Sequence, residues 1–122
     1  MSSTPRAFAH EGLSLNLSFT KDTATLVWSG VSEMRSPEVV LDPFLKGCVT
    51  DVKGYKLIVD FRTFEFMSSA TQAPIMQFLK SLDKNKIPTQ VLYSTKMEWQ
   101  RISYRCMKIL FRVMPSVQFE CL

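Results

Sequence analysis

Histidine is almost absent from this chain: His10 is the only one among 122 residues. Ser-His-Asp and Cys-His catalysis both need an imidazole held beside the nucleophile. His10 lies in a polar N-terminal stretch, where a solvated side chain is expected. The sequence therefore lacks the usual hydrolase and thiol-enzyme sites, and we expect a protein that is not an enzyme.

Glycine and cysteine are also scarce, with four and three residues. The few glycines form neither a GxGxxG nor a GxxxxGK[ST] loop, the patterns that cradle phosphates. The cysteines Cys48, Cys106 and Cys121 are widely spaced and include no CxxC pair, so they do not resemble a zinc site. We expect three free thiols in a reducing cytoplasm, and no metal or cofactor.

Long apolar runs are missing as well. No stretch approaches the ~20 residues of a membrane span, and the N-terminus has no apolar segment typical of a signal peptide. The composition, 46% hydrophobic and 21% charged, is that of a globular protein. We expect one soluble cytoplasmic domain without a membrane span.

The first third of the chain predicts an arm followed by a hairpin. Residues 1–12 are polar and small, and we expect a flexible arm there. Apolar and polar residues alternate over 13–18, which is typical of a half-buried strand. A turn signal at Lys21-Asp22 leads to a second strand over 24–28.

The next segments predict a helix and a buried strand. Residues 36–38, Ser-Pro-Glu, form a helix-start signal. Pro43 should kink or split this helix, and Gly47 should end it. The three aliphatic residues 57–59 then predict a strand buried on both faces, as in a parallel sheet.

The second half continues the alternation. A helix is expected up to about Lys84, a strand over 90–93, a helix over 97–113 and a last strand over 117–119. An apolar stripe that we expect to be buried runs along the last helix: Ile102, Cys106, Ile109 and Val113. The order ββαβαβαβ predicts a single α/β domain over 13–122, with mainly parallel central strands, about three crossover helices and an N-terminal hairpin.

A cluster of hydroxyl residues opens the helix that precedes Lys84. Ser69 with Gln72 has the spacing of a capping box. The same position suits an anion, because helix N-termini present unpaired N–H groups, and a phosphorylated serine would place its charge beside them. Pro74 predicts that the regular helix begins nearer Thr71 than Ser69, which would leave Ser68 and Ser69 in the preceding turn.

Basic residues gather in the second half of the chain. Residues 61–122 carry nine basic and four acidic residues, a net +5, whereas residues 1–60 carry six and seven, a net −1. Four of the cations recur along the last helix: Arg101, Arg105, Lys108 and Arg112. They form either a solvated face or a surface for an acidic protein or anionic lipid. Nucleic acid is not expected, because only Tyr104 is interleaved among them.

Residues 55–75 carry a family resemblance. A hydrophobic strand, Leu57-Ile58-Val59-Asp60-Phe61, is followed by Phe64-Glu65-Phe66-Met67-Ser68-Ser69 and an amphipathic helix. This pattern resembles the STAS domain of bacterial anti-sigma factor antagonists. The segment Trp28-Ser29-Gly30-Val31-Ser32-Glu33, followed by Pro37, is similar to a subgroup of small bacterial STAS-like regulators.

The resemblance implies a non-enzymatic, protein-binding regulator in signal transduction and transcription. In the family, an anti-sigma factor that is also a serine kinase phosphorylates the first serine of an Asp-Ser-Ser-Gly motif. Ser69 matches that serine, whereas Ser68, Ala70 and Thr71 stand where the family has aspartate, serine and glycine. Ser68 and Thr71 are therefore alternative phosphate acceptors.

The expected partner is an anti-sigma-type serine kinase or another signalling protein. Its expected contact surface comprises Arg62, Met67, Gln72, Trp99, Arg101 and Arg105. Two alternatives remain open. One is a self-association module that forms a homodimer through edge strands, near residues 13–18 or at the last strand. The other binds a small anionic ligand at the 68–71 turn.

Overall fold

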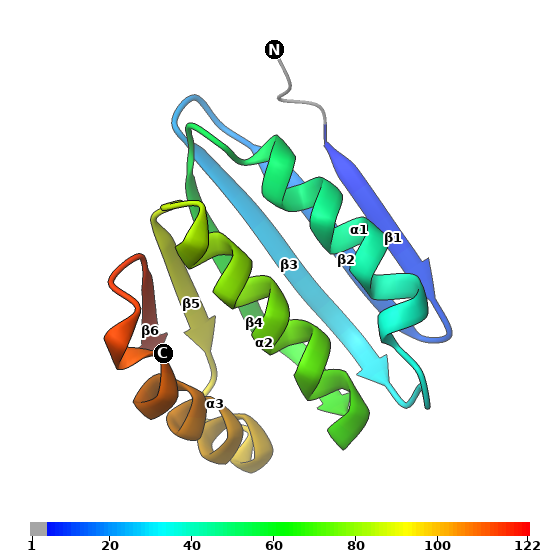
Figure 1. Ribbon diagram of the computed structural model, residues 1–122. Helices are drawn as coiled ribbons and strands as arrows, with labels where there is room; N and C mark the ends of the chain where they lie inside the picture. Colours follow the sequence, from blue (N-terminus) through cyan, green and yellow to red (C-terminus); the bar gives the residue numbers. More distant parts are fainter. Residues whose placement is uncertain (1–4) are drawn as a thin grey trace.

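A six-stranded sheet carries three helices on one of its faces (Figure 1). The computed structural model describes residues 5–122. The strands are β1 (Arg6–His10), β2 (Leu13–Phe19), β3 (Thr23–Ser32), β4 (Lys56–Met67), β5 (Thr89–Tyr93) and β6 (Val117–Cys121). The helices are α1 (Glu38–Asp51), α2 (Ser69–Lys84) and α3 (Glu98–Leu110), which runs into a 3-10 turn, Phe111–Val113.

The strand order in the sheet is the order of the chain, β1 to β6. β1, β2 and β3 pair antiparallel, whereas β3 to β6 are parallel. Each right-handed crossover therefore steps in the same direction, and all the helices come to lie on the same face. The expected α/β architecture is confirmed: mainly parallel central strands, three helices and an N-terminal hairpin.

The sheet is buried on one face only, which corrects the expectation for residues 57–59. Leu57 and Val59 are fully buried under the helices, but Ile58 between them is partly exposed on the other face. An aliphatic run predicts burial on both faces only where helices cover both. Within residues 5–122, no helix lies above the second face.

The expected flexible arm is wrong for residues 6–10, which form β1 along the edge of β2. A two-residue turn, Glu11-Gly12, joins the two strands, with φ of 48° and 90°. Such a turn needs positive φ at both residues, which favours glycine. Packing of Phe8 on Phe44, 5.4 Å between ring centroids, ties β1 to α1. Residues 1–4 of the expected arm lie outside the described residues.

Helix α1 also differs from the expectation, because it runs without a break through Pro43 and Gly47. Pro43 lacks the N–H that would bond to the carbonyl of Val39, and Val39 is a 70% exposed residue in the first turn of the helix, where the loss of this bond costs less than in a buried segment. At Gly47 the guanidinium of Arg6 lies over the bare backbone, and a Cβ there would be 3.0 Å from Arg6 Nη1. Arg6 reaches past Gly47 to pair with Asp51.

Only β1 and β6 are edge strands in the described sheet. The self-association alternative supposes a free edge near residues 13–18 or at the last strand. The segment 13–18 lies inside β2 instead, hydrogen-bonded to β1 and β3 on its two sides. The last strand is an edge, as that alternative supposes.

Helix α3 turns the opposite side to the core from the one expected. Its buried residues are Gln100, Tyr104 and Met107. The stripe expected to be buried is exposed: Ile102, Cys106, Ile109 and Val113. The Gln100 side chain donates to the carbonyls of Phe61 and Phe64, at 2.5 and 2.7 Å. Tyr104 stacks on Phe61 with 4.7 Å between ring centroids, and these contacts fix the rotation of the helix.

Candidate functional site

Three hydroxyl groups meet where β3 ends, β4 ends and α2 begins. The Ser32 Oγ lies 2.7 Å from the Thr71 Oγ1, and the Ser68 Oγ lies 3.0 Å from the same atom. The backbone N–H of Ser68 donates to the Ser32 carbonyl at 2.7 Å, which continues the β3–β4 pairing to its end. Sequence reasoning did not assign Ser32 to this site, since its partner in the chain is 39 residues away.

The start of α2 corrects two expectations. The helix begins at Ser69, with Ser68 as its N-cap residue, rather than near Thr71. Ser69 is not the cap of a capping box with Gln72. Pro74 is tolerated as the sixth helical residue because the carbonyl left without a donor belongs to Ala70, an exposed residue.

Ser68 does not cap the helix with its side chain either. Its backbone has the extended conformation of an N-cap residue, φ −68° and ψ 159°. The hydroxyl turns away from the helix N–H groups and lies 3.2 Å from the Met34 carbonyl oxygen, to which it donates. Ser68 thus links the start of α2 to the β3–α1 connection.

The three expected phosphate acceptors are therefore in different environments. Thr71 is fully buried and Ser68 is half-buried, and both use their hydroxyls in the cluster. Ser69 is exposed at the first position of α2, and no hydrogen bond among residues 5–122 uses its hydroxyl. Of the three, only Ser69 presents a free hydroxyl to the surface.

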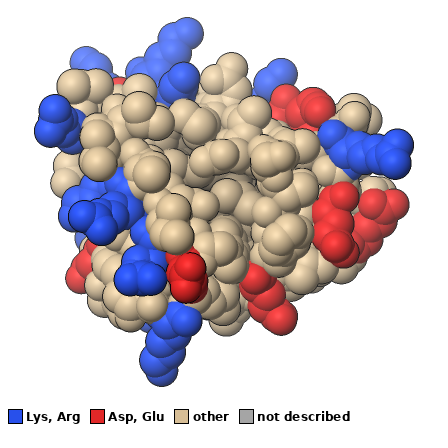
Figure 2. Space-filling view, turned by 90° about the horizontal axis from the view of Figure 1, so that it is seen from below, with Lys and Arg blue, Asp and Glu red and all other residues tan. Residues whose placement is uncertain are grey.

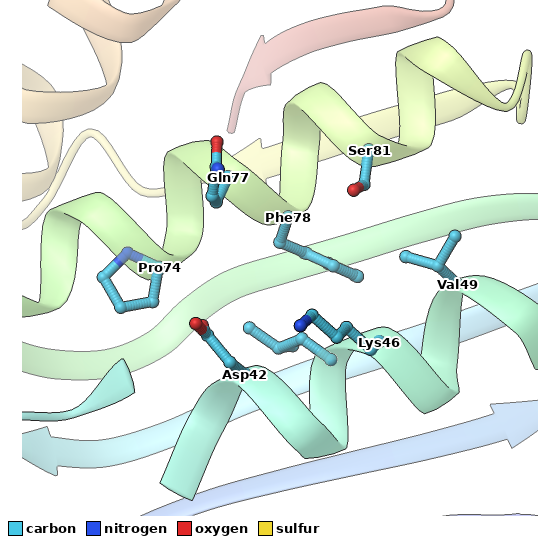
Figure 3. A pocket seen from close by; sticks show the side chains of 8 residues that line it. Asp42, Lys46, Val49, Pro74, Gln77, Phe78 and Ser81 are labelled. Atoms are coloured by element: carbon cyan, nitrogen blue, oxygen red, sulfur yellow. The ribbon is translucent and has the colours of Figure 1, made fainter. Parts of the chain in front are cut away.

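A shallow groove runs between α1 and α2 and reaches the same end of α2. Its main part, about 170 Å³, lies over Phe78 and between Asp42 and Lys46 on α1 and Pro74 and Gln77 on α2 (Figure 3). A second part of about 150 Å³ continues past the first turns of both helices, where Glu38, Ala70 and Ala73 line it. Ser69 immediately precedes this lining in the sequence.

Arg62 forms an ion pair with Asp60. Its side chain donates to Asp60 at 2.9 and 3.0 Å, and its backbone N–H adds a third bond at 3.0 Å. Partial burial raises the pKa of Asp60, but the hydrogen bonds and charge of Arg62 outweigh this and leave the pKa below its usual value. Among the described residues Arg62 makes no bond to the hydroxyl cluster. Met67 and Gln72 are also expected on the partner surface. Both are half-buried, and they adjoin Ser68 and Thr71 of the hydroxyl cluster in the sequence.

Trp99 packs against the end of β4. Its Nε1 donates to the Glu65 carbonyl at 2.7 Å, and its ring meets Phe64 edge to face at 5.5 Å. The residue is half-buried, and its place on a partner surface stays a prediction. Arg101 and Arg105 follow on α3, and both are exposed.

Figure 2 views the end of the molecule at which α2 and α3 begin. Most of the Lys and Arg side chains lie on the side of α3 and most of the Asp and Glu side chains on the side of α1, with a few charges of the opposite sign on each side. A broad, mostly uncharged surface separates the two sides. This end thus presents a central area with few charges between a mainly basic and a mainly acidic side.

Two classes of site have no basis in the described residues. Within residues 5–122, no group of three His, Cys, Asp or Glu side chains is placed to hold a metal ion. None of the helices in that range is long and apolar enough to cross a membrane.

Comparison with known proteins places the fold. No family model matches the chain, and no curated protein matches it in sequence. An anti-sigma factor antagonist from Mycobacterium paratuberculosis superposes with a TM-score of 0.59 at 14% identity, covering 95% of this chain and 86% of that one. An uncharacterised protein with a SpoIIAA-like fold from Shewanella loihica superposes with a TM-score of 0.57 at 13% identity, and the match covers 96% of this chain and 90% of that one. The chain therefore has a STAS-like fold, that of the anti-sigma factor antagonists.

Proposed function

We propose that this protein is a regulatory protein-binding module whose partner choice is switched by phosphorylation of Ser69. The observation that carries the proposal is the exposure of this hydroxyl at the start of α2, while Ser68 and Thr71 are engaged in the cluster. The STAS-like fold supports it, since one structural neighbour is an anti-sigma factor antagonist.

Phosphorylation of Ser69 would change the charge of this surface. A phosphoserine adds almost two negative charges. The first turn of α2 contains no acidic residue, and the positive end of the helix dipole stabilises an anion there. The phosphate would therefore be tolerated by the fold, and its main effect would fall on a bound protein.

The partner surface that we propose is centred on the first turn of α2. It includes Ser69, the neighbouring groove lining at Ala70 and Ala73, and the half-buried Trp99 on the other side. A partner packed against this surface would meet an unpaired phosphate at the interface. Desolvating that charge is costly, so phosphorylation is expected to release the partner.

The proposed partner is a signalling protein, either a serine kinase of the anti-sigma type or another component that reads the same surface. Ser68 replaces the aspartate of the family motif, and its hydroxyl is used inside the fold. A kinase acting here would recognise the exposed turn rather than an adjacent carboxylate.

The test begins with the chain isolated from its own cell. Phosphopeptide mapping is expected to find a single modified position, Ser69. Affinity capture with the unmodified chain, Ser69→Ala and Ser69→Asp should then recover a partner with the first two and lose it with the third.

Ser36→Asp is the matched control, because Ser36 is an exposed serine before the start of α1. It should recover the same partner as the unmodified chain. Phosphate on another residue, or the same partner recovered with Ser69→Asp, would contradict the proposal.

A further inference from the structure

The outward side of α3 and the turn that follows it is aliphatic. Ile102 is 55% exposed, Ile109 and Leu110 are 58% exposed, and Val113 is 77% exposed. We call these four residues the outer stripe. They account for four of the seven large hydrophobic residues exposed in the described chain, although α3 and its turn contain only sixteen residues.

The outer stripe is not a displaced core. Gln100, Tyr104 and Met107 hold the opposite side of α3 against the sheet, and Phe111 continues that side into the turn. With 3.6 residues per turn, the outer stripe falls on the side of the helix away from these contacts. A contiguous exposed aliphatic surface of this kind marks an interaction site.

Cations border the outer stripe on one side. Arg101, Arg105, Lys108 and Arg112 recur at intervals of four, three and four residues, and all four are exposed. None of them takes part in an ion pair among residues 5–122. The helix has one acidic residue, Glu98 at its start. Whatever covers the stripe therefore meets four uncompensated positive charges.

We propose that the outer stripe rests on an anionic lipid surface, with α3 lying in the plane of the membrane interface. Aliphatic residues on one side and Lys and Arg beside them are the composition of helices that bind in this way. The aliphatic stems of arginine and lysine can lie along the apolar surface while their charged ends reach lipid phosphates. This role is independent of the phosphorylation switch proposed above.

The composition of the stripe favours lipid over a protein partner. Binding energy at protein interfaces concentrates in Trp, Tyr and Arg, whereas Leu and Val are under-represented there. The aromatic residues of α3 turn toward the protein: Tyr104 is buried, and Trp99 bonds to the Glu65 carbonyl. A second copy of the chain is disfavoured, since pairing two such helices would bring eight cations together.

The test is co-sedimentation of the full chain with vesicles. Vesicles of phosphatidylcholine mixed with phosphatidylglycerol should bring the protein down at low salt, and vesicles of phosphatidylcholine alone should not. Binding should weaken as salt rises, because the attraction between cations and the anionic surface is screened. Arg105→Gln should weaken binding about fivefold, whereas Lys80→Gln, an exposed cation on α2, should leave it unchanged.

A second pair of variants tests the contribution of the aliphatic side chains to vesicle binding. Ile109→Ser should weaken vesicle binding about tenfold or more, through loss of buried aliphatic surface. Val39→Ser, at a 70% exposed aliphatic residue on α1, should have no effect. All four substitutions are on the surface, so circular dichroism should show intact folds.

Three results would overturn the proposal. The first is a chain that stays in solution with the anionic vesicles at low salt. The second is equal binding to both kinds of vesicle. The third is equal loss with Ile109→Ser and Val39→Ser. If vesicles do not bind but an acidic protein does so through the stripe, the lipid assignment is wrong and a protein occupies this surface.

Discussion

The hydroxyls of Ser32 and Thr71 lie 2.7 Å apart, and neither residue is exposed to solvent. Their bond joins the last residue of β3 to the first turn of α2 across 39 positions of the chain. A tertiary contact thus positions the start of the helix, in the place where a side-chain cap would be expected. The exposed Ser69 gains its defined orientation from these buried neighbours.

Removing the Thr71 hydroxyl should therefore destabilise the protein. Thr71→Val keeps the shape of the side chain but leaves the buried Ser32 hydroxyl without its partner, at a cost of about 1–3 kcal/mol. Ser32→Ala should cost less, because Thr71 keeps its bond to Ser68. Urea unfolding measures both.

The double variant distinguishes this contact from two unrelated losses. If the hydroxyls depend on one another, the double variant should lose less stability than the sum of the singles, by at least about 0.5 kcal/mol. Ser18→Ala, at an exposed serine of β2, should be neutral and serves as the control. Additive losses would show that the two hydroxyls do not interact.

Gln100 should be among the most sensitive positions of the chain. Its amide donates to the Phe61 and Phe64 carbonyls and accepts from the Ser94 N–H at 2.9 Å. Gln100→Leu would leave these backbone groups unpaired, with a loss of about 3 kcal/mol or more in unfolding free energy. Gln77→Leu, at an exposed glutamine of α2, should change stability by less than about 0.5 kcal/mol. Equal effects of the two substitutions would remove the assigned role of Gln100.

Gly30 should tolerate no side chain. Its φ is +84°, and a Cβ there would collide with the Gly12 carbonyl oxygen. Gly54 has a similar φ of +90° but open space around it. A substitution at Gly54 therefore measures the cost of backbone strain alone, without a steric collision. Gly54→Ala should cost about 1 kcal/mol, and Gly30→Ala considerably more, as thermal unfolding would reveal. Similar costs at the two sites would contradict the close approach of β3 to the β1–β2 turn.

The three cysteines should differ sharply in reactivity. Burial raises the pKa of the Cys48 thiol to about 12, although the nearby Arg6 acts in the opposite direction. The thiolate is the reactive form, so Cys48 stays protonated and inert through the range where an ordinary thiol ionises. Cys106 and Cys121 are exposed and should react with a thiol reagent at pH 8.

The reagent should thus titrate two thiols in the native protein and three in urea. A variant that carries both Cys106→Ser and Cys121→Ser should show no native reaction. Rapid labelling of this variant at pH 8 would place Cys48 outside the core.

The elements that depend on local patterns could be predicted from the sequence. The alternation over 13–18 lies in β2, and the turn at Lys21-Asp22 lies between β2 and β3. The run at 57–59 lies in β4. The hydroxyl residues 68–71 do lie at the start of a helix, although α2 begins at Ser69 and not near Thr71 as Pro74 had indicated.

Two of the larger errors have a different cause, since β1 and the rotation of α3 depend on contacts between distant residues. β1 is stabilised by Phe8 packing on Phe44, which no pattern within residues 1–12 reveals. The rotation of α3 follows from the bonds that Gln100 makes to β4. The strongest apolar periodicity of that helix therefore faces solvent, and periodicity alone gives no sign of this.

The sequential strand order also has a consequence for how the chain folds. Every strand pairs with the one that precedes it in the sequence, so each new pairing closes only a hairpin or a single crossover. Short closures of this kind cost little chain entropy and favour rapid folding. The sheet can consequently grow strand by strand in the direction of synthesis. The pairing of β6 with β5 then forms last.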